Sequence, residues 1–548
     1  MNKFIIIIVI NILYLKADAQ HSNIFLGNSS FNIIEENILL YEKNHSSFKP
    51  LIKSDIINYT DNLYFNSSSI IKSNSTYFNR LFNQHILTFS DTGFKIIVCP
   101  IFNFSFGNEL MEEKSLFTNT RGYLIQGDLA ENFSFSTSFL ENQSIFPNYL
   151  DDYVNENRIV PGQGRMRIFK EKGFDYAMSS GYISYRPSNM FVLQFGHGKH
   201  FVGDGYRSLL LSDNSFNYPF LRLQTTFWKL KYTNLYAEFQ DIRYFSSNNL
   251  ANYDQMGFAK KYMSAHHLSL SISKRLNISL FESVIWRMNH APGSNGFDIN
   301  YLNPVALLRP LEFSLNSPDN VLVGLNIKYR LTNKSYMYSQ IVLDEFSLPN
   351  LRENRDFWAN KFGYQMGYKI YSFLGVDNLT TQFEYNYVRP YTYAHHNPQQ
   401  NYAHYNQPLA HPLGANFSES LFITRYRIKR FELDAKIIFA KVGMDYNDSE
   451  VSYGSNLYMS TGNHGAEAGL TGLGSGRPSD FDINMYQGNL SDIKSYSFNL
   501  AYLINPYTNT KINLGFLYRE FVNQEEYEKT QFFTFGIKSD LFNYYYDF

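Results

Sequence analysis

The chain has 548 residues, of which 44% are hydrophobic, 18% aromatic and 18% charged, and its formal net charge is −1. This near-neutral balance supplies no bulk positive field and argues against nucleic acid as a partner. Its one cysteine, Cys99, excludes an internal disulfide framework.

The first residues predict an export signal. Lys3 precedes an apolar run over residues 4–15, and Ala17-Asp18-Ala19 fits a small-residue cleavage site that would leave Gln20 as the mature N-terminus. Beyond this run, no stretch has the roughly 18 apolar residues that a spanning helix needs. We therefore predict a signal peptide over residues 1–19. The mature chain would be soluble in the exported compartment or would cross a membrane as strands.

Residues 20–100 are predicted to form a small periplasmic lead-in. The sequence up to about Leu87 is polar, rich in Asn and Ser, and has no clear period. Residues 76–87 fit a short helix, which would lie near the mouth of a barrel. A flexible linker is the alternative.

From Ile101 onward, apolar and polar side chains alternate in segment after segment. Such alternation gives a strand one apolar and one polar face. Clear examples are Phe102, Phe104 and Phe106; Phe133, Phe135 and Phe139; Leu268, Leu270 and Ile272; Val321, Val323, Leu325 and Ile327; Tyr364, Met366, Tyr368 and Ile370; and Phe383, Tyr385 and Tyr387.

A membrane barrel explains these faces better than a soluble sandwich does. The apolar faces are rich in aromatic residues, as in interfacial girdles, and the polar faces carry charges such as those of Arg425 and Asp434, which suit a wet lumen. The alternation of Phe542, Tyr544, Tyr546 and Phe548 predicts an aromatic final strand. We predict an all-β fold over residues 101–548, a transmembrane antiparallel β-barrel of about 14 to 18 strands in the outer membrane. A soluble all-β secreted protein is the alternative.

Loop lengths predict which end of the barrel faces outward. Short turns such as residues 505–507 are expected on the periplasmic side, and longer polar stretches on the outside. The candidates for outer loops are residues 288–300, 390–418 and 446–491.

A glycine-rich stretch begins as a strand at Phe191 and then breaks at four glycines before Tyr218. Glycine allows backbone conformations that other residues resist, so the stretch is predicted to fold back, turning into the barrel or capping it. It does not match the G-x-x-x-x-G-K-[ST] nucleotide-binding loop. It either braces the lumen or binds a sugar or anion through its polar side chains. The candidate residues are His197, Lys199, His200, Asp204, Tyr206 and Arg207.

A second cluster combines histidines with tyrosines in the expected outer loop 390–418. Tyrosine faces pack on sugar rings, and imidazoles bond hydroxyl groups, so the loop fits a glycan contact. A transition-metal site is a weaker interpretation because the spacing matches no established zinc pattern, and a purely structural loop is a third. The candidate glycan-binding residues are Tyr391, Tyr393, His395, His396, His404 and His411. No catalytic residue, metal ligand or cofactor is predicted.

Several motifs resemble the outer-membrane proteins called RemB, which are associated with gliding motility. The longest is Gly196-His-Gly-Lys-His-Phe-Val-Gly-Asp-Gly-Tyr-Arg207 with its continuation to Pro219. More distantly, the chain is similar to the Wzi family of capsule-assembly barrels. The other matching stretches are Phe146-Pro-Asn-Tyr149, Val160-Pro-Gly-Gln-Gly164, Asn303-Pro304 with Arg309-Pro-Leu-Glu-Phe313, Tyr385-Asn-Tyr-Val-Arg-Pro390 with its continuation to Pro398, and Tyr405-Asn-Gln-Pro-Leu-Ala-His-Pro-Leu-Gly414.

The resemblance implies an outer-membrane barrel that handles surface polysaccharide. We expect a non-enzymatic protein that binds or organises exopolysaccharide or capsule glycan, contacts outer-membrane lipid, and works with motility or secretion machinery at the cell surface. The main rival is a passive or substrate-specific channel. A barrel enzyme acting on lipid or protein would need a converged acid–base pair, for which the sequence gives no evidence.

Overall fold

The computed structural model describes most of the chain. Residues 1–20, where the signal peptide is predicted, lie outside it, as does most of the expected outer loop 288–300. The described residues are 21–39, 45–56, 74–170, 172–243, 258–287, 298–305, 307–315, 319–352, 356–447, 449–462 and 476–548.

Eighteen antiparallel strands form one closed barrel. Each strand pairs with its neighbours in the ring, and β24 pairs with β3 to close it. The predicted fold class is confirmed, at the upper end of the expected strand number. The wall strands are β3 (Phe94–Glu109), β4 (Lys114–Leu129), β5 (Phe133–Ile145), β7 (Gly173–Tyr185), β8 (Phe191–Gly198), β10 (Tyr218–Phe227), β11 (Leu230–Asp241), β12 (Ala259–Ser271), β13 (Leu276–Arg287), β14 (Asn320–Thr332), β15 (Ser335–Glu345), β16 (Lys361–Ile370), β17 (Leu379–Val388), β20 (Phe417–Ile428), β21 (Phe431–Met444), β22 (Asn489–Asn505), β23 (Thr510–Val522) and β24 (Tyr527–Ser539).

The short elements lie at the barrel ends, against the wall or in the lumen. None of the helices described is both long enough and apolar enough to span a bilayer. They are α2 (Asn28–Ile38), α3 (Lys53–Ile56), α4 (Thr76–Asn83), α5 (Asn148–Asn157), η5 (Ile299–Leu302), α6 (Leu308–Leu315), α7 (Leu348–Arg352), η6 (Phe373–Gly375) and η7 (Pro398–Gln400), with the short strands β1 (Phe48–Lys49), β2 (Leu87–Asp91), β6 (Met166–Phe169), β9 (Phe201–Val202), β18 (Ala403–His404) and β19 (Gln407–Pro408).

The alternating pattern places apolar side chains outside and polar side chains inside. On β8, Phe195 is 65% exposed, whereas the adjacent Gln194 is fully buried. Large exposed apolar side chains also include Phe106 on β3 and Phe535 on β24. Inside, Arg425 on β20 and Asp434 on β21 form an ion pair of 2.6 Å. This is the distribution of an outer-membrane barrel, whose exterior contacts lipid.

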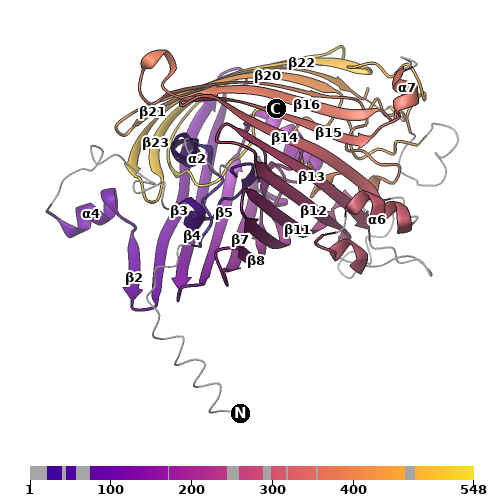
Figure 1. Cartoon of the computed structure of the whole chain (residues 1–548). Helices are drawn as coiled ribbons and strands as arrows, with labels where there is room; N and C mark the ends of the chain where they lie inside the picture. Colours follow the sequence, from indigo (N-terminus) through magenta and orange to yellow (C-terminus); the bar gives the residue numbers. More distant parts are fainter. Residues whose placement is uncertain are drawn as a thin grey trace, which may run out of the picture.

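The two ends of the barrel differ. At one end the strands are joined by short turns, as between β10 and β11 or β14 and β15, and the predicted turn at residues 505–507 lies here. The helix predicted over residues 76–87 is present as α4, whose backbone carbonyls accept hydrogen bonds from Asn505 at this end. The long loops lie at the other end, near α6 and α7 (Figure 1), where short turns also join β3 to β4 and β23 to β24. By the usual rule, the short-turn end faces the periplasm.

Four segments from distant parts of the chain fill the lumen, and we call them together the plug. They are the N-terminal segment (residues 21–39 and 45–56), the glycine-rich loop (199–217), the histidine loop (389–416) and the C-terminal tail (540–548). Figure 1 shows α2 and the C-terminus within the outline of the barrel. β1 of the first segment pairs with β9 of the second.

Two expectations about the ends of the barrel sequence need correction. The wall begins at Phe94 rather than at Ile101, and the N-terminal segment lies inside the barrel rather than beside its mouth. The predicted aromatic final strand is wrong, because β24 ends at Ser539 and the following tail turns into the lumen. There, the tail's aromatic side chains pack against buried residues of the wall and of α5. Burial in the lumen therefore produces the same alternation as exposure to lipid.

Candidate functional site

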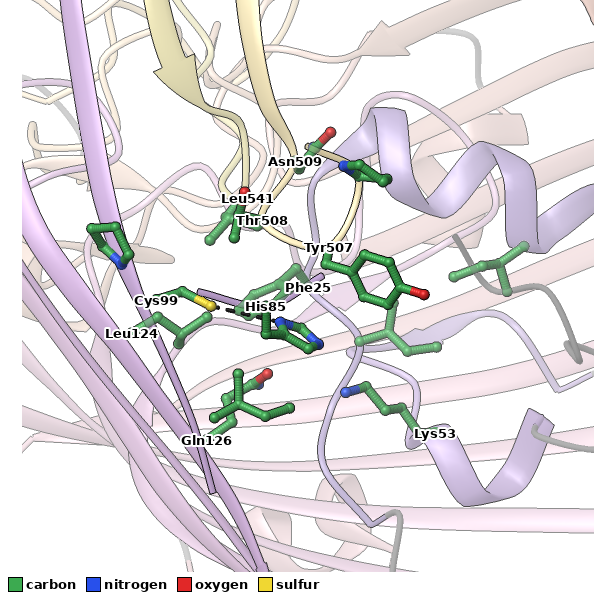
Figure 2. Close-up of a pocket in the computed structure, with 15 residues that line it drawn as sticks. Phe25, Lys53, His85, Cys99, Leu124, Gln126, Tyr507, Thr508, Asn509 and Leu541 are labelled. Atoms are coloured by element: carbon green, nitrogen blue, oxygen red, sulfur yellow. Dashed lines mark hydrogen bonds between the residues drawn. The ribbon is translucent and has the colours of Figure 1, made fainter. Parts of the chain in front are cut away.

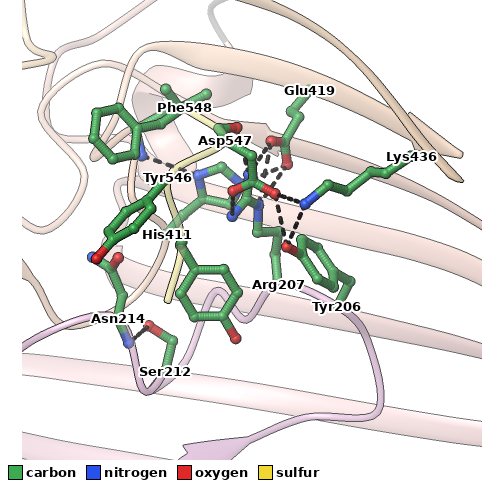
Figure 3. A network of polar contacts seen from close by, with 12 residues as sticks. Tyr206, Arg207, Ser212, Asn214, His411, Glu419, Lys436, Tyr546, Asp547 and Phe548 are labelled. Carbon is green, nitrogen blue, oxygen red and sulfur yellow. Dashed lines mark hydrogen bonds and ion pairs between the residues drawn. The ribbon is translucent and has the colours of Figure 1, made fainter. Parts of the chain in front are cut away.

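The centre of the plug is a buried ion network around Arg207, a residue of the glycine-rich loop (Figure 3). Its guanidinium donates to Glu419 on β20 at 2.9 Å and to Asp547 of the C-terminal tail at 3.0 Å. Lys436 on β21 also pairs with Asp547, and Tyr206 donates its hydroxyl to the same carboxylate at 2.7 Å. Two cations thus face two anions, which offsets the cost of burying each charge.

The electrostatics of this network favour the charged state. Burial alone would raise the pKa of the Asp547 carboxyl, but Arg207 and Lys436 lower that pKa below its usual range. Burial alone would also lower the pKa of Arg207, whereas Asp547 and Glu419 hold it above the ordinary value. The network therefore ties a lumen loop, two wall strands and the tail together at neutral pH.

A second network joins the N-terminal segment to the glycine-rich loop and the wall. Asp204 accepts from Lys328 on β14 at 3.2 Å and from Ser46 at 2.8 Å. Glu35 on α2 pairs with Lys369 on β16 at 2.7 Å and with Lys328 at 3.5 Å. Burial alone would raise the pKa of Glu35, but the two lysines lower it below its usual range.

The glycine-rich loop turns inward, as the sequence predicts, and one glycine shows why. A Cβ atom on Gly205 would clash with the carboxylate of Glu384 on β17. That carboxylate accepts the backbone N–H groups of Tyr206 at 2.7 Å and Arg207 at 3.0 Å. The absence of a side chain lets the loop approach the wall closely enough to make these bonds.

The histidine loop also folds inward instead of covering the outside. Tyr393 and Tyr402 donate their hydroxyls to backbone carbonyls of the glycine-rich loop, at 2.7 and 2.8 Å. The backbone N–H of Ser212 donates to the carbonyl of Leu409 at 2.7 Å. The two loops form one packed body because their backbone polar groups satisfy each other.

The histidines of this loop do not converge on one point. His411 contacts Glu419 at 2.8 Å, His404 accepts from the backbone of Gln240 at 3.0 Å, and His395 bonds to Asn397 close by in sequence. Burial lowers the pKa of His404 to about 3 and that of His395 to about 4, so both are neutral at pH 7. Among the described residues, no three His, Cys, Asp or Glu side chains are grouped to hold a metal ion.

Most of the predicted glycan-binding side chains are therefore engaged with protein. The structure buries His200, Asp204, Tyr206, Arg207, Tyr391, Tyr393, His395, His404 and His411. His197 and Lys199 are half-buried and bonded to backbone carbonyls, and His396 is exposed. A direct glycan contact stays a prediction for these residues, whereas their contacts within the plug are observed. Sequence reasoning missed their acidic partners Glu384, Glu419 and Asp547, and it missed Glu35 of the second network.

Side chains with the chemistry of a sugar contact lie instead at the loop-bearing end. Between β15 and β16, Phe357 and Trp358 are half-buried, and Phe357 packs on Phe481 from the β21–β22 loop with ring centroids 5.3 Å apart. Arg477 lies 3.8 Å over the Trp358 ring and pairs with Asp480 at 2.7 Å. We call these five residues the Trp358 cluster. It combines aromatic rings with charged hydrogen-bonding groups.

A small cavity lies at the short-turn end (Figure 2). It is lined by β3, the turn between β22 and β23, and the N-terminal segment, and it holds His85 and Cys99 with Sγ and Nδ1 at 3.6 Å. Burial lowers the pKa of His85 to about 4. At about 30 Å³ the cavity has room for a water molecule but not for a sugar.

These features define an outer-membrane β-barrel whose lumen is filled by its own chain. No protein-family model and no curated protein matches the sequence.

The solved structure of another outer-membrane barrel agrees with this fold. Wzi of Escherichia coli, an outer-membrane protein involved in group 1 capsule assembly and a carbohydrate-binding β-barrel, aligns with a TM-score of 0.55 and 13% identity, over 95% of this chain and 100% of that one. OprD of Pseudomonas aeruginosa aligns with a TM-score of 0.40 and 9% identity, over 81% of this chain and 94% of that one. OccAB2 of Acinetobacter baumannii aligns with a TM-score of 0.41 and 9% identity, over 82% of this chain and 97% of that one.

Proposed function

We propose that this protein is a non-enzymatic outer-membrane barrel that binds or organises exopolysaccharide at its loop-bearing end. The observation that carries the proposal is the plug. Buried ion pairs tie its N-terminal segment, glycine-rich loop and tail to the wall, and the histidine loop contacts Glu419 on β20 through His411. A large ligand would therefore meet the outer face rather than pass through. The likeness to Wzi, a carbohydrate-binding barrel, supports the same choice.

The Trp358 cluster is the proposed contact surface. Arg477 covers one face of the Trp358 ring, so the half-buried rings of Phe357 and Phe481 and the uncovered part of Trp358 would meet sugar C–H groups. Asp480, whose side chain is 41% exposed, would accept hydrogen bonds from hydroxyls. The plug acids Glu35, Asp204 and Asp547 are paired with Arg or Lys, so their electrostatics favour a structural role over acid–base chemistry.

Glycan retention at the surface tests this proposal. A strain lacking the protein would be complemented with the intact chain or with a Phe357→Ala, Trp358→Ala variant. We expect the variant to insert normally but to retain less exopolysaccharide and to bind less glycan on an array. Trp228→Ala is the matched control, because Trp228 is 61% exposed in the short turn between β10 and β11, at the opposite end. Equal retention by all three forms, or no glycan binding by the intact chain, would contradict the proposal.

A channel remains the second candidate because the lumen wall is polar, but it requires at least part of the plug to move. A role in gliding is a further proposal, which rests on the RemB-like motifs alone. Surface spreading of the deletion strain tests that role separately, since a strain that spreads normally while losing exopolysaccharide would exclude it.

A further inference from the structure

We propose that η5 and α6, with the residues that flank them, form an element embedded in the outer leaflet of the membrane. We call residues 298–305 and 307–315 the wall helix segment. It lies at the loop-bearing end, outside the barrel (Figure 1). It contains Asn303-Pro304 and the Arg309–Phe313 motif, to which the proposed function gives no role.

The segment packs on the lipid-facing side of the wall. On β13, Leu280, Glu282, Val284 and Trp286 share the outward face because successive side chains alternate. Leu280 is 55% exposed, as expected of a side chain that faces lipid. Val284 and Trp286 are buried instead, because Tyr301 and Leu308 of the wall helix segment cover them.

The wall beneath the segment is unusually polar for an outward face. Glu282 pairs with His266 on β12 at 3.0 Å, and His266 lies opposite Asn234 on β11 in the strand register. The second carboxylate oxygen of Glu282 accepts the backbone N–H of Leu308, at the start of α6, at 3.1 Å. A carboxylate or imidazole directed at acyl chains is strongly unfavourable, so these groups require a cover.

The outer side of the segment is mostly apolar and exposed. Its Arg309, whose side chain is 60% exposed, pairs with Glu312 at 2.9 Å, and so long a side chain can reach the headgroup level from the outer leaflet. Ile299, Val305, Leu307 and Phe313 are 74%, 80%, 65% and 83% exposed. Val323 on β14, the register partner of Glu282, is 40% exposed on the same outer side of the wall. The exposed side chains of the segment therefore extend the lipid-facing surface of the barrel. Acyl chains are the occupant that this continuity favours.

Spin labels on the full chain in lipid bilayers test the proposal. In a Cys99→Ser background, a label at Phe313→Cys would be compared with labels at two control sites. Leu280→Cys reports the lipid-facing wall, and Glu450→Cys reports an exposed loop residue at the outer end. Relaxation by oxygen, which concentrates in the bilayer, is measured against relaxation by a water-soluble nickel chelate.

We expect the oxygen-to-nickel ratio at Phe313 to lie close to the value at Leu280 and well above the value at Glu450. A ratio nearer to that of Glu450 would overturn the proposal and would leave the apolar side chains free for a soluble partner. Should Phe313→Cys fail to give a folded barrel, Leu307→Cys provides the same readout on the same side of the segment.

Discussion

Arg207 is the residue on which most of the plug depends. It lies in the glycine-rich loop, is 2% exposed, and contacts acids that lie 212 and 340 positions further along the chain. Neutralising it would leave Glu419 and Asp547 in a dry environment with fewer partners. Breaking a buried pair from one side destabilises more than forming the pair stabilises.

We predict that Arg207→Ala destabilises the plug by about 3–5 kcal/mol. Urea unfolding of the refolded barrel measures this as a lower free energy of unfolding. The matched control is Arg425→Ala. The side chains of Arg425 and Asp434 are 20% and 33% exposed, so their ion pair should contribute only about 0–1 kcal/mol to stability. An equal decrease in the free energy of unfolding in the two variants would contradict the claim that the Arg207 network contributes more than an exposed ion pair.

Acidification should loosen the plug. Asp547 and Glu35 both have pKa values below their usual range in the folded state because of their paired cations, although burial opposes this. A depressed carboxyl pKa contributes stability that is complete above the unfolded pKa of about 4 and is lost as the pH falls through the folded value. We expect the urea concentration at the unfolding midpoint to decrease once the pH is lowered below about 4. In an Asp547→Asn variant the urea midpoint should decrease less on acidification. An identical decrease in the variant and the intact chain would show that Asp547 does not contribute to the pH dependence.

At this scale the sequence predicted members of the site but not their partners. The glycine-rich stretch identified Asp204, Tyr206 and Arg207 because unusual residues gather there. Glu384 and Glu419 are single acids among uncharged neighbours on alternating strands, and that isolation is a signal that could have been used. Asp547 carried no such signal, because its contacts with Arg207 and Lys436 depend on how the tail turns after β24.

Among the elements, the C-terminal tail shows the limits of periodicity. Its row of alternating aromatic residues has the period of the wall strands, although in the lumen both rows contact protein: Leu541 and Tyr545 are buried, and the aromatic row is partly buried against the wall. What differs is the surface that covers that row, lipid for a strand and the lumen wall for the tail. The wall strands were predictable because hydrogen-bonded neighbours repeat the pattern many times. The inward turn of the histidine loop depends on contacts with the glycine-rich loop and was not predictable.

Removing the tail should open the lumen without opening the wall. We predict that deletion of residues 541–548 leaves the β24–β3 ladder intact, because its pairs run from Asn103–Lys538 to Glu109–Phe532. The barrel would keep its heat-modifiable mobility on a gel, while proteoliposomes would swell faster in small sugars. The full-length Asp547→Ala variant loses the ion pair but keeps the tail, so it separates the effect of the ion pair from the effect of emptying part of the lumen. Unchanged swelling in both variants would mean that the other three segments close the lumen alone.

The whole molecule combines a lipid-facing wall, a filled interior and two unlike ends. Four segments and many buried charges are used to close the lumen, whereas the loop-bearing end exposes aromatic and charged groups. The general architecture followed from alternation and loop length, since both reflect the bilayer. Whether the lumen is open depends on long-range contacts, and these required the structure.

Conductance in planar bilayers tests the central claim that the plug closes the barrel. The intact chain at neutral pH should insert and give no steady ion current, because buried ion pairs bind the plug to β14, β16, β20 and β21. A stable, ohmic current through single inserted molecules would contradict the account and would favour a channel.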